Sequence, residues 1–185
     1  MVRVRFVTRN KHKVLEASAV LARYDIEVVQ AQRSKVEIQS ASLEEVVRYA
    51  LRSLKPESEP IVVEDAGLFI HRLNGFPGPY SSFVYKTIGI EGVLKLMEGV
   101  EDREASFASV VGILTPSGEV RLFSGVTKGS IATESRGSKG FGFDPIFIPE
   151  GCDKTFAEMS IEEKNALSHR AKAFMKLGEW LTNKS

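Results

Sequence analysis

The chain has 185 residues, of which 43% are hydrophobic and 26% are charged, and its formal net charge is +1. This length and composition predict a single globular domain over residues 1–185. The near-neutral charge argues against a nucleic-acid binder, because affinity for a phosphate backbone depends on a large cationic excess.

Other bulk features indicate where the protein works. No stretch approaches the roughly 18 apolar residues that a membrane span needs, so we expect no contact with a membrane. Charge within the apolar run at the N-terminus argues against a signal peptide. Cys152 is the only cysteine and cannot form an intrachain disulfide, which favours a reducing, cytoplasmic location.

The first 70 residues predict strands that alternate with helices. Apolar residues alternate with Arg3 and Arg5 at the N-terminus, as in a strand, and apolar residues at helical spacing follow. A second strand is expected at 26–32. Residues 42–54 predict a helix with a Ser-x-x-Glu cap, and residues 60–70 predict a buried strand with an interruption.

The rest of the chain predicts a hairpin between two loops and a final helix. Two Gly and two Pro make 74–81 a rigid loop. Residues 105–115 and 119–132 predict two strands joined by a turn. A Gly-rich segment at 136–149 leads into a short strand, and 160–183 predicts one closing helix. The sequence therefore predicts an α/β fold with a mixed sheet.

Polar and basic residues follow the first strand directly, where the first helix should begin. The exposed N–H groups and the dipole of a helix start can bind an anion. Lys11 and Lys13 add positive charge there, and Thr8 and Asn10 add neutral polar groups. The alternative is that Asn10 only caps the helix and the basic side chains face solvent. The chain contains no P-loop pattern.

Three acidic residues lie among apolar neighbours, at Glu37, Glu64 and Asp65. Adjacent residues of a strand face opposite sides, so Glu64 and Asp65 should have different roles, and Gly67 after them should let the backbone turn. Carboxylate oxygens suit Mg²⁺, which usually binds one or two protein carboxylates together with substrate phosphates. The alternative is that these acids pair with basic residues, or that Asp65 starts a turn.

The Gly-rich loop offers a surface for a flat ring. Gly140 and Gly142 allow the backbone to approach a ligand closely. Phe141 and Phe143 offer faces on which a base could stack. The alternative is a tight bend whose Phe side chains fill the core.

The closing helix carries a cation within its apolar stripe. On a helical wheel Arg170 falls inside the stripe and Lys164 at its border, whereas His169 lies away from it. A buried Arg needs an acid, a carbonyl or a ligand, so Arg170 either reads a base or makes an internal ion pair. His169 is expected at the surface or in a cap. Together these segments describe a nucleoside triphosphate site with metal-assisted hydrolysis as its chemistry.

Five segments, in the same order, resemble the motifs of the inosine triphosphate pyrophosphatase family. This resemblance implies an elongated mixed α/β fold with two lobes around a nucleotide-binding cleft, and a homodimer. It also implies Mg²⁺-dependent cleavage of ITP, dITP and XTP to the monophosphate and pyrophosphate. The segments are Thr8–Lys13, Val63–Leu68, Gly75–Ser81, Gly140–Phe147 and Glu163–Arg170.

The resemblance also implies roles for individual residues. The metal-binding acids would be Glu37 and Asp65, with Glu64 adjacent, and Asp65 would also be the catalytic acid or base. The phosphates would bind the segment Thr8, Arg9, Asn10, Lys11, His12 and Lys13. Contacts to the nucleotide would come from Ala66, Phe141, Gly142, Phe143, Asp144, Lys164, His169 and Arg170. The chain departs from the family pattern at Arg9, where relatives usually carry a small residue, and at Ser82, where some carry Lys.

The expected mechanism is attack of water on the α-phosphorus with pyrophosphate leaving. Arg170 can only donate hydrogen bonds, so it should favour the 6-oxo group of inosine or xanthine over the 6-amino group of adenine. One alternative function is a pyrophosphatase for modified pyrimidine nucleotides. Another is a nucleotide-binding regulator without turnover, but a protein that only binds a tetra-anion gains little from added carboxylates.

Overall fold

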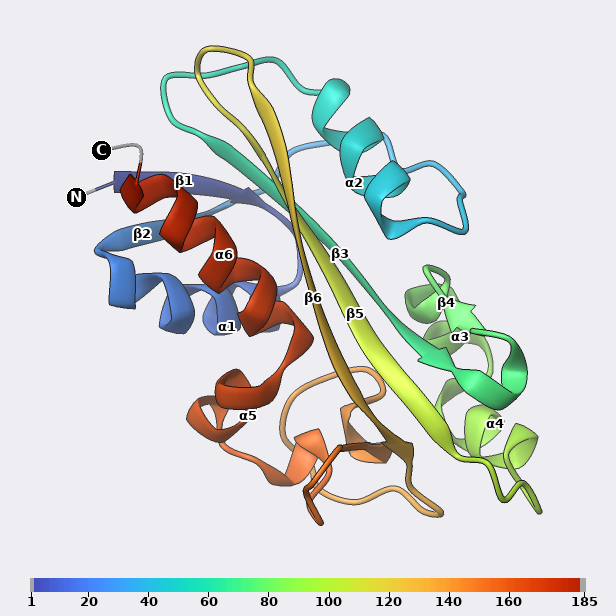
Figure 1. Cartoon of the computed structure of the whole chain (residues 1–185). Coiled ribbons are helices and arrows are strands. Elements are labelled where there is room, and N and C mark those ends of the chain that lie inside the picture. Colours follow the sequence, from blue (N-terminus) through green and yellow to red (C-terminus); the bar gives the residue numbers. More distant parts are fainter. Residues whose placement is uncertain (1, 184–185) are drawn as a thin grey trace.

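The computed structural model of the chain describes residues 2–183 and contains one mixed seven-stranded sheet (Figure 1). The strand order is β2-β1-β3-β5-β6-β7, and β4 pairs with β3. β1 runs parallel to β2 and β3, whereas the remaining pairs are antiparallel. The strands are β1 (Val2–Val7), β2 (Ile26–Ala31), β3 (Ile61–Ile70), β4 (Pro77–Gly78), β5 (Glu104–Leu114), β6 (Val120–Ile131) and β7 (Phe147–Pro149).

Six α-helices and four short 3₁₀ turns connect and cover the described strands. The helices are α1 (Lys11–Leu21), α2 (Leu43–Arg52), α3 (Ser81–Thr87), α4 (Gly89–Leu96), α5 (Ile161–Leu167) and α6 (His169–Asn183). The 3₁₀ turns are η1 (Ala22–Tyr24), η2 (His71–Leu73), η3 (Asp144–Ile146) and η4 (Phe156–Glu158). No helix within residues 2–183 is long and apolar enough to cross a membrane.

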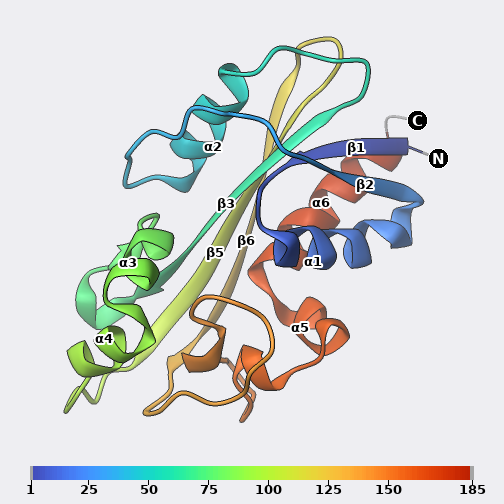
Figure 2. The same cartoon turned by 180° about the vertical axis from the view of Figure 1, so that it is seen from behind.

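The helices cover both faces of the sheet because successive strand residues point to opposite sides. Val62 and Val111 pack in a core with α1 and α6, whereas their neighbours Val63 and Val110 pack with α2. A third core lies at the far end of the long strands, against α3 and α4. Figures 1 and 2 show β3, β5 and β6 running from β1, β2, α1, α2 and α6 at one end to α3 and α4 at the other. The predicted elongated, mixed α/β fold is confirmed.

β3 is continuous, so the predicted interruption is wrong. Every residue from Ile61 to Ile70 pairs with β5. Gly67 does not turn the chain, because it pairs with Ala108 of β5 like its neighbours. A Cβ at Gly67 would lie 2.2 Å from the carbonyl oxygen of Gly78. Gly67 instead leaves room for β4 to approach β3.

The predicted closing helix is two helices that separate at Ser168. The backbone of Ser168 is extended, at φ −71° and ψ 149°, and its Oγ accepts a hydrogen bond of 3.1 Å from the N–H of Ala171. Ser168 therefore starts a new helix, as serine commonly does at an N-cap. The predicted caps at Ser42 and Ser160 are confirmed, since the side chain of each accepts a bond from the N–H three residues later.

Candidate active site

A cleft of about 900 Å³ crosses the middle of β3, a volume typical of small-molecule sites. It is lined by the turn between β1 and α1, the loop after β2, α3, the loop before η3 and the start of α6. Most of the predicted site residues line it, namely Thr8, Arg9, Asn10, His12, Lys13, Glu37, Glu64, Asp65, Ala66, Phe141, Gly142, Phe143, Asp144, His169 and Arg170. Lys11 is exposed outside the lining, and Lys164 is buried behind it.

The turn between β1 and α1 is organised by Asn10, which is the N-cap of α1, as the sequence suggests. Asn10 Oδ1 accepts hydrogen bonds from the N–H groups of His12, at 2.9 Å, and Lys13, at 3.4 Å. Thr8 Oγ1 accepts a bond of 3.1 Å from the N–H of Asn10. Since the N–H groups of Asn10, His12 and Lys13 already have partners, an anion at this turn would also need side chains such as those of Arg9 and Lys13.

Glu64 is buried and serves internal ion pairs. Its Oε1 accepts bonds from Ser109 Oγ at 2.8 Å and Arg170 Nε at 3.0 Å, and its Oε2 lies 2.6 Å from Lys13 Nζ. Burial raises the pKa of Glu64, but Arg170 and Lys13 outweigh burial and bring the pKa down to about 2. Glu64 is therefore ionised near neutral pH and positions Lys13 and Arg170.

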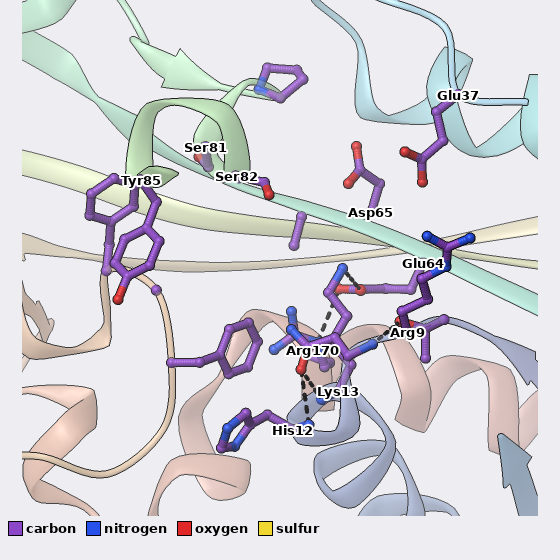
Figure 3. A pocket seen from close by; sticks show the side chains of 18 of the residues that line it. Arg9, His12, Lys13, Glu37, Glu64, Asp65, Ser81, Ser82, Tyr85 and Arg170 are labelled. Atoms are coloured by element: carbon purple, nitrogen blue, oxygen red, sulfur yellow. Dashed lines mark hydrogen bonds and ion pairs between the residues drawn. The ribbon is translucent and has the colours of Figure 1, made fainter. Parts of the chain in front are cut away.

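Asp65 lies on the other side of β3 and points toward Glu37 (Figure 3). Burial raises the pKa of the Asp65 carboxyl, which Lys13 opposes only in part. Within residues 2–183 Asp65 makes no ion pair. Glu37 is exposed in the loop after β2 and contacts Lys35, whose hydrogen bond lowers the pKa of Glu37. A half-buried carboxylate without an ion pair, next to a second acid, is a donor set that fits a divalent metal.

A buried network of charged side chains supports the cleft from behind. Lys164 Nζ lies 2.7 Å from Glu16 Oε1 and 2.6 Å from Asp144 Oδ2. Arg170 Nη1 lies 2.7 Å from Glu16 Oε2. With the pairs of Glu64, three cations face three acids, so the positive and negative charges of this network balance. Arg170 thus makes internal ion pairs, which was one of the two alternatives predicted for it.

Glu16 was not predicted as a site residue, although its position in the sequence indicated a buried charge. Glu16 precedes the buried Ala17 and lies four residues before the buried Val20, on the apolar face of α1. A Glu on such a face is almost never buried unless it is paired, so this position predicts a cationic partner.

The Gly-rich loop is built around the carboxylate of Asp144. The N–H of Phe141 donates a hydrogen bond of 2.9 Å to Asp144 Oδ2. Gly140 has a φ of +71°, and a Cβ there would lie 2.1 Å from the same oxygen, so glycine is required. The Phe141 ring is half-buried and lies 5.1 Å from Arg170 Cζ. Phe143 is only 3% exposed and packs in the core, so the core alternative holds for Phe143.

The prediction that His169 lies at the surface is wrong. Its ring is buried and stacks on Phe107, with centroids 4.6 Å apart and 9° between the planes. The break at Ser168 starts a separate helix with His169, so one continuous helical wheel misplaced it. Burial, together with the nearby Arg170, lowers the pKa of His169 well below its usual value, so the ring is neutral. In the described part of the chain its Nδ1 has no hydrogen-bond partner.

The cleft also contains basic side chains that were not predicted as site residues. Arg33 and Lys35 reach it from the loop after β2, and Lys86 reaches it from α3. Arg33 pairs with Glu57 and Lys35 pairs with Glu37. Arg33 and Lys35 form a basic cluster just before Glu37 in the sequence, which could have indicated their place beside this acid. The position of Lys86 in the cleft depends on tertiary packing alone.

Comparison with known proteins identifies the family. The model of the Ham1 family matches residues 4–180, which is nearly the whole chain. The chain belongs to the Ham1 family. Two solved structures share this Ham1 fold over 99% of the chain and 100% of their own length. They are the Ham1 protein of Staphylococcus aureus, with a TM-score of 0.83 and 28% identity, and that of Coxiella burnetii, with 0.82 and 31%.

Curated Ham1 relatives are still more similar in sequence. The dITP/XTP pyrophosphatase of Pyrococcus horikoshii is 56% identical over 177 residues, which cover 95% of each chain. The dITP/XTP pyrophosphatase of Methanopyrus kandleri is 53% identical over 182 residues, or 98% of this chain and 97% of the relative. The resemblance that the five motif segments suggested is therefore confirmed as family membership.

Proposed function

We propose that this chain is a Mg²⁺-dependent pyrophosphatase that cleaves dITP, XTP and ITP to the nucleoside monophosphate and pyrophosphate. Residues 1–185 would act as one domain. The observation that carries the proposal is a cleft in which cations at the start of α1 face the acids Asp65 and Glu37 across β3. The names of the two curated relatives support dITP and XTP as substrates.

The triphosphate would lie against the start of α1. Lys13 is held by Glu64 at 2.6 Å, and this pair keeps the ammonium group at the wall of the cleft. Arg9 is exposed at the same turn. As the bond between the α- and β-phosphates breaks, charge develops on the leaving pyrophosphate, and fixed cations stabilise that charge without reorganising.

Asp65 and Glu37 would hold the Mg²⁺. When bound, the metal ion would neutralise phosphate charge and lower the pKa of water. Asp65 has a raised pKa and no ion pair in residues 2–183, which suits a carboxylate that either binds the metal or accepts the proton of the attacking water. Glu64 is a weaker candidate ligand, because both of its oxygens already contact partners.

The base would be bound by Phe141 and the start of α6. Arg170 uses Nε and Nη1 for Glu64 and Glu16, and within residues 2–183 its Nη2 makes no hydrogen bond. Nη2 is thus a donor left for the 6-oxo group of inosine or xanthine. The neutral His169 lies next to it, and Lys164 sits behind the Phe141 ring, 5.2 Å from its centroid.

The proposal includes a homodimer and a cytoplasmic location. Large apolar side chains are exposed on and between α3 and α4, with Phe83 68%, Leu96 48% and Ile88 44% exposed. Exposed apolar groups of this kind are typical of surfaces that bind another protein. The lone Cys152 is consistent with a reducing compartment.

A substrate panel tests the proposed function. With Mg²⁺ we expect dITP, XTP and ITP to give monophosphate and pyrophosphate in equal amounts, with dATP and dGTP turned over much more slowly. Removal of the metal with a chelator should stop turnover, and added Mg²⁺ should restore it. A preference for modified pyrimidine triphosphates would support the first alternative function. Tight binding without any product would support a regulator.

A further inference from the structure

The first turn of α1 presents an aromatic side chain to the loop that carries Phe141. His12 is the second residue of α1, and its ring stacks on the Phe141 ring. The ring centroids are 5.4 Å apart and the planes differ by 22°. Both residues line the cleft, although their segments lie far apart in the sequence.

The Phe141 ring contacts three side chains, since Lys164 Nζ lies 5.2 Å and Arg170 Cζ 5.1 Å from its centroid in addition to the His12 ring. The backbone of Phe141 is fixed by the bond to Asp144, but the side chain is half-buried. Among the rings of residues 2–183, His12 is the one that stacks on Phe141. Phe143, by contrast, is held in the core and meets Tyr85 edge to face, with centroids 5.5 Å apart.

The backbone around His12 is also fixed. The N–H of His12 donates a hydrogen bond of 2.9 Å to Asn10 Oδ1, so the cap of α1 sets where the imidazole ring begins. A stacked contact at this separation is offset and uses the flat surface of the imidazole, so it does not require a polar nitrogen. Through this contact, the turn between β1 and α1, whose cations are proposed to bind phosphate, touches the Phe141 ring. Arg170 and Lys164 lie against the same ring.

We infer that His12 is a positioning residue for the base, which acts by holding the Phe141 ring in the orientation that accepts a purine. This inference rests on the proposed function and refines it. In this account the His12 side chain contributes to binding through Phe141 and not through the phosphates. The first turn of α1 would therefore bind the phosphates through Lys13 and orient the ring for the base through His12.

Steady-state kinetics of His12→Ala and His12→Phe test the inference. An aromatic pair changes an equilibrium by about 2- to 12-fold. We expect His12→Ala to raise KM for dITP by about 3- to 10-fold with kcat nearly unchanged. His12→Phe, which keeps a flat ring but has no polar nitrogen, should restore KM to within about 2-fold. In Phe141→Ala, a further His12→Ala substitution should change KM little.

Inhibition by inorganic triphosphate, which has no base, separates this role from phosphate binding. Its inhibition constant should be the same in the wild type, His12→Ala and His12→Phe. The inference is overturned if both variants lose affinity for inorganic triphosphate, since His12 would then be a phosphate ligand. It is also overturned if His12→Ala leaves KM for dITP unchanged or lowers it, because a lower KM would mean that His12 occupies the place of the base.

Proton NMR of the imidazole groups tests the stack without any substrate. The chain has three His residues, so the resonances of His12 can be assigned from its variants. In Phe141→Leu we expect the His12 resonances to move as the ring current is lost, while those of His71, outside the cleft, stay in place. Unmoved His12 resonances would contradict the stack. Moved resonances in a protein that does not cleave dITP would instead reject the proposed function and keep the stack.

Discussion

Replacement of Asp65 by Asn is expected to lower kcat for dITP by about 10³-fold, within the range for loss of a general acid or base. The substitution keeps the shape of the side chain and removes the charge that would hold Mg²⁺ or accept a proton. Because Asp65 makes no ion pair within residues 2–183, the fold should lose little stability. Such a loss in kcat with binding retained marks an interaction made in the transition state.

Glu37→Gln provides the matched comparison for Asp65→Asn. Glu37 faces the same space but is exposed and contacts Lys35, so we expect a higher Mg²⁺ requirement with a smaller loss in kcat. Kinetics over a Mg²⁺ series, with dITP binding measured by calorimetry, check both variants. Near-normal kcat in Asp65→Asn would remove Asp65 from the mechanism.

Replacement of Arg170 is expected to reduce the preference for dITP over dATP by about 10²-fold. A site built around a hydrogen bond can reject the wrong group by about 10⁴-fold, whereas an apolar pocket manages about 10²-fold. With adenine, Nη2 of Arg170 would face another donor and remain unpaired. The measurement is kcat/KM for both nucleotides in the wild type and in Arg170→Lys.

The choice of Lys follows from the ion pairs of Arg170. Arg170→Ala would leave the buried carboxylates of Glu16 and Glu64 short of a cation, and breaking a buried pair costs about 3–5 kcal/mol. Lys keeps the charge but lacks the planar fork that can bind both acids and a base at once. A retained dITP/dATP preference in a folded Arg170→Lys would make Arg170 purely structural.

Arg103→Lys is a control for the loss of an arginine fork. Arg103 donates hydrogen bonds of 2.7 to 2.8 Å to the carbonyls of Ile131, Met97 and Ala132 and does not line the cleft. We expect this variant to lose stability without a change in the dITP/dATP preference.

Local patterns in the sequence predicted most of the fold. Alternation of apolar residues located the strands, and the Ser-x-x-Glu pairs located two helix starts, because both signals act over a few residues. The break at Ser168 was missed since the apolar stripe continues across it. Gly67 was misread because its role is to admit β4, and a contact between strands leaves no local pattern.

The site was predictable from the sequence where a charged residue falls among apolar ones. Arg170 in an apolar stripe correctly indicated a buried partner, and Glu16 on the apolar face of α1 carried the same kind of signal. Partners themselves could not be assigned, since Lys164 and Glu16 lie far apart in the chain and meet only through packing. The stack of His12 on Phe141 could not be predicted either, because these rings also meet only through packing.

Hydrolysis of dITP in water enriched in ¹⁸O tests whether water attacks the α-phosphorus. The proposed attack on the α-phosphorus puts the oxygen of water into the monophosphate, and mass spectrometry of the two products locates the label. We expect one ¹⁸O in dIMP and none in pyrophosphate, in a reaction that depends on Mg²⁺ and Asp65. Label in pyrophosphate, or formation of dIDP and orthophosphate, would contradict attack on the α-phosphorus.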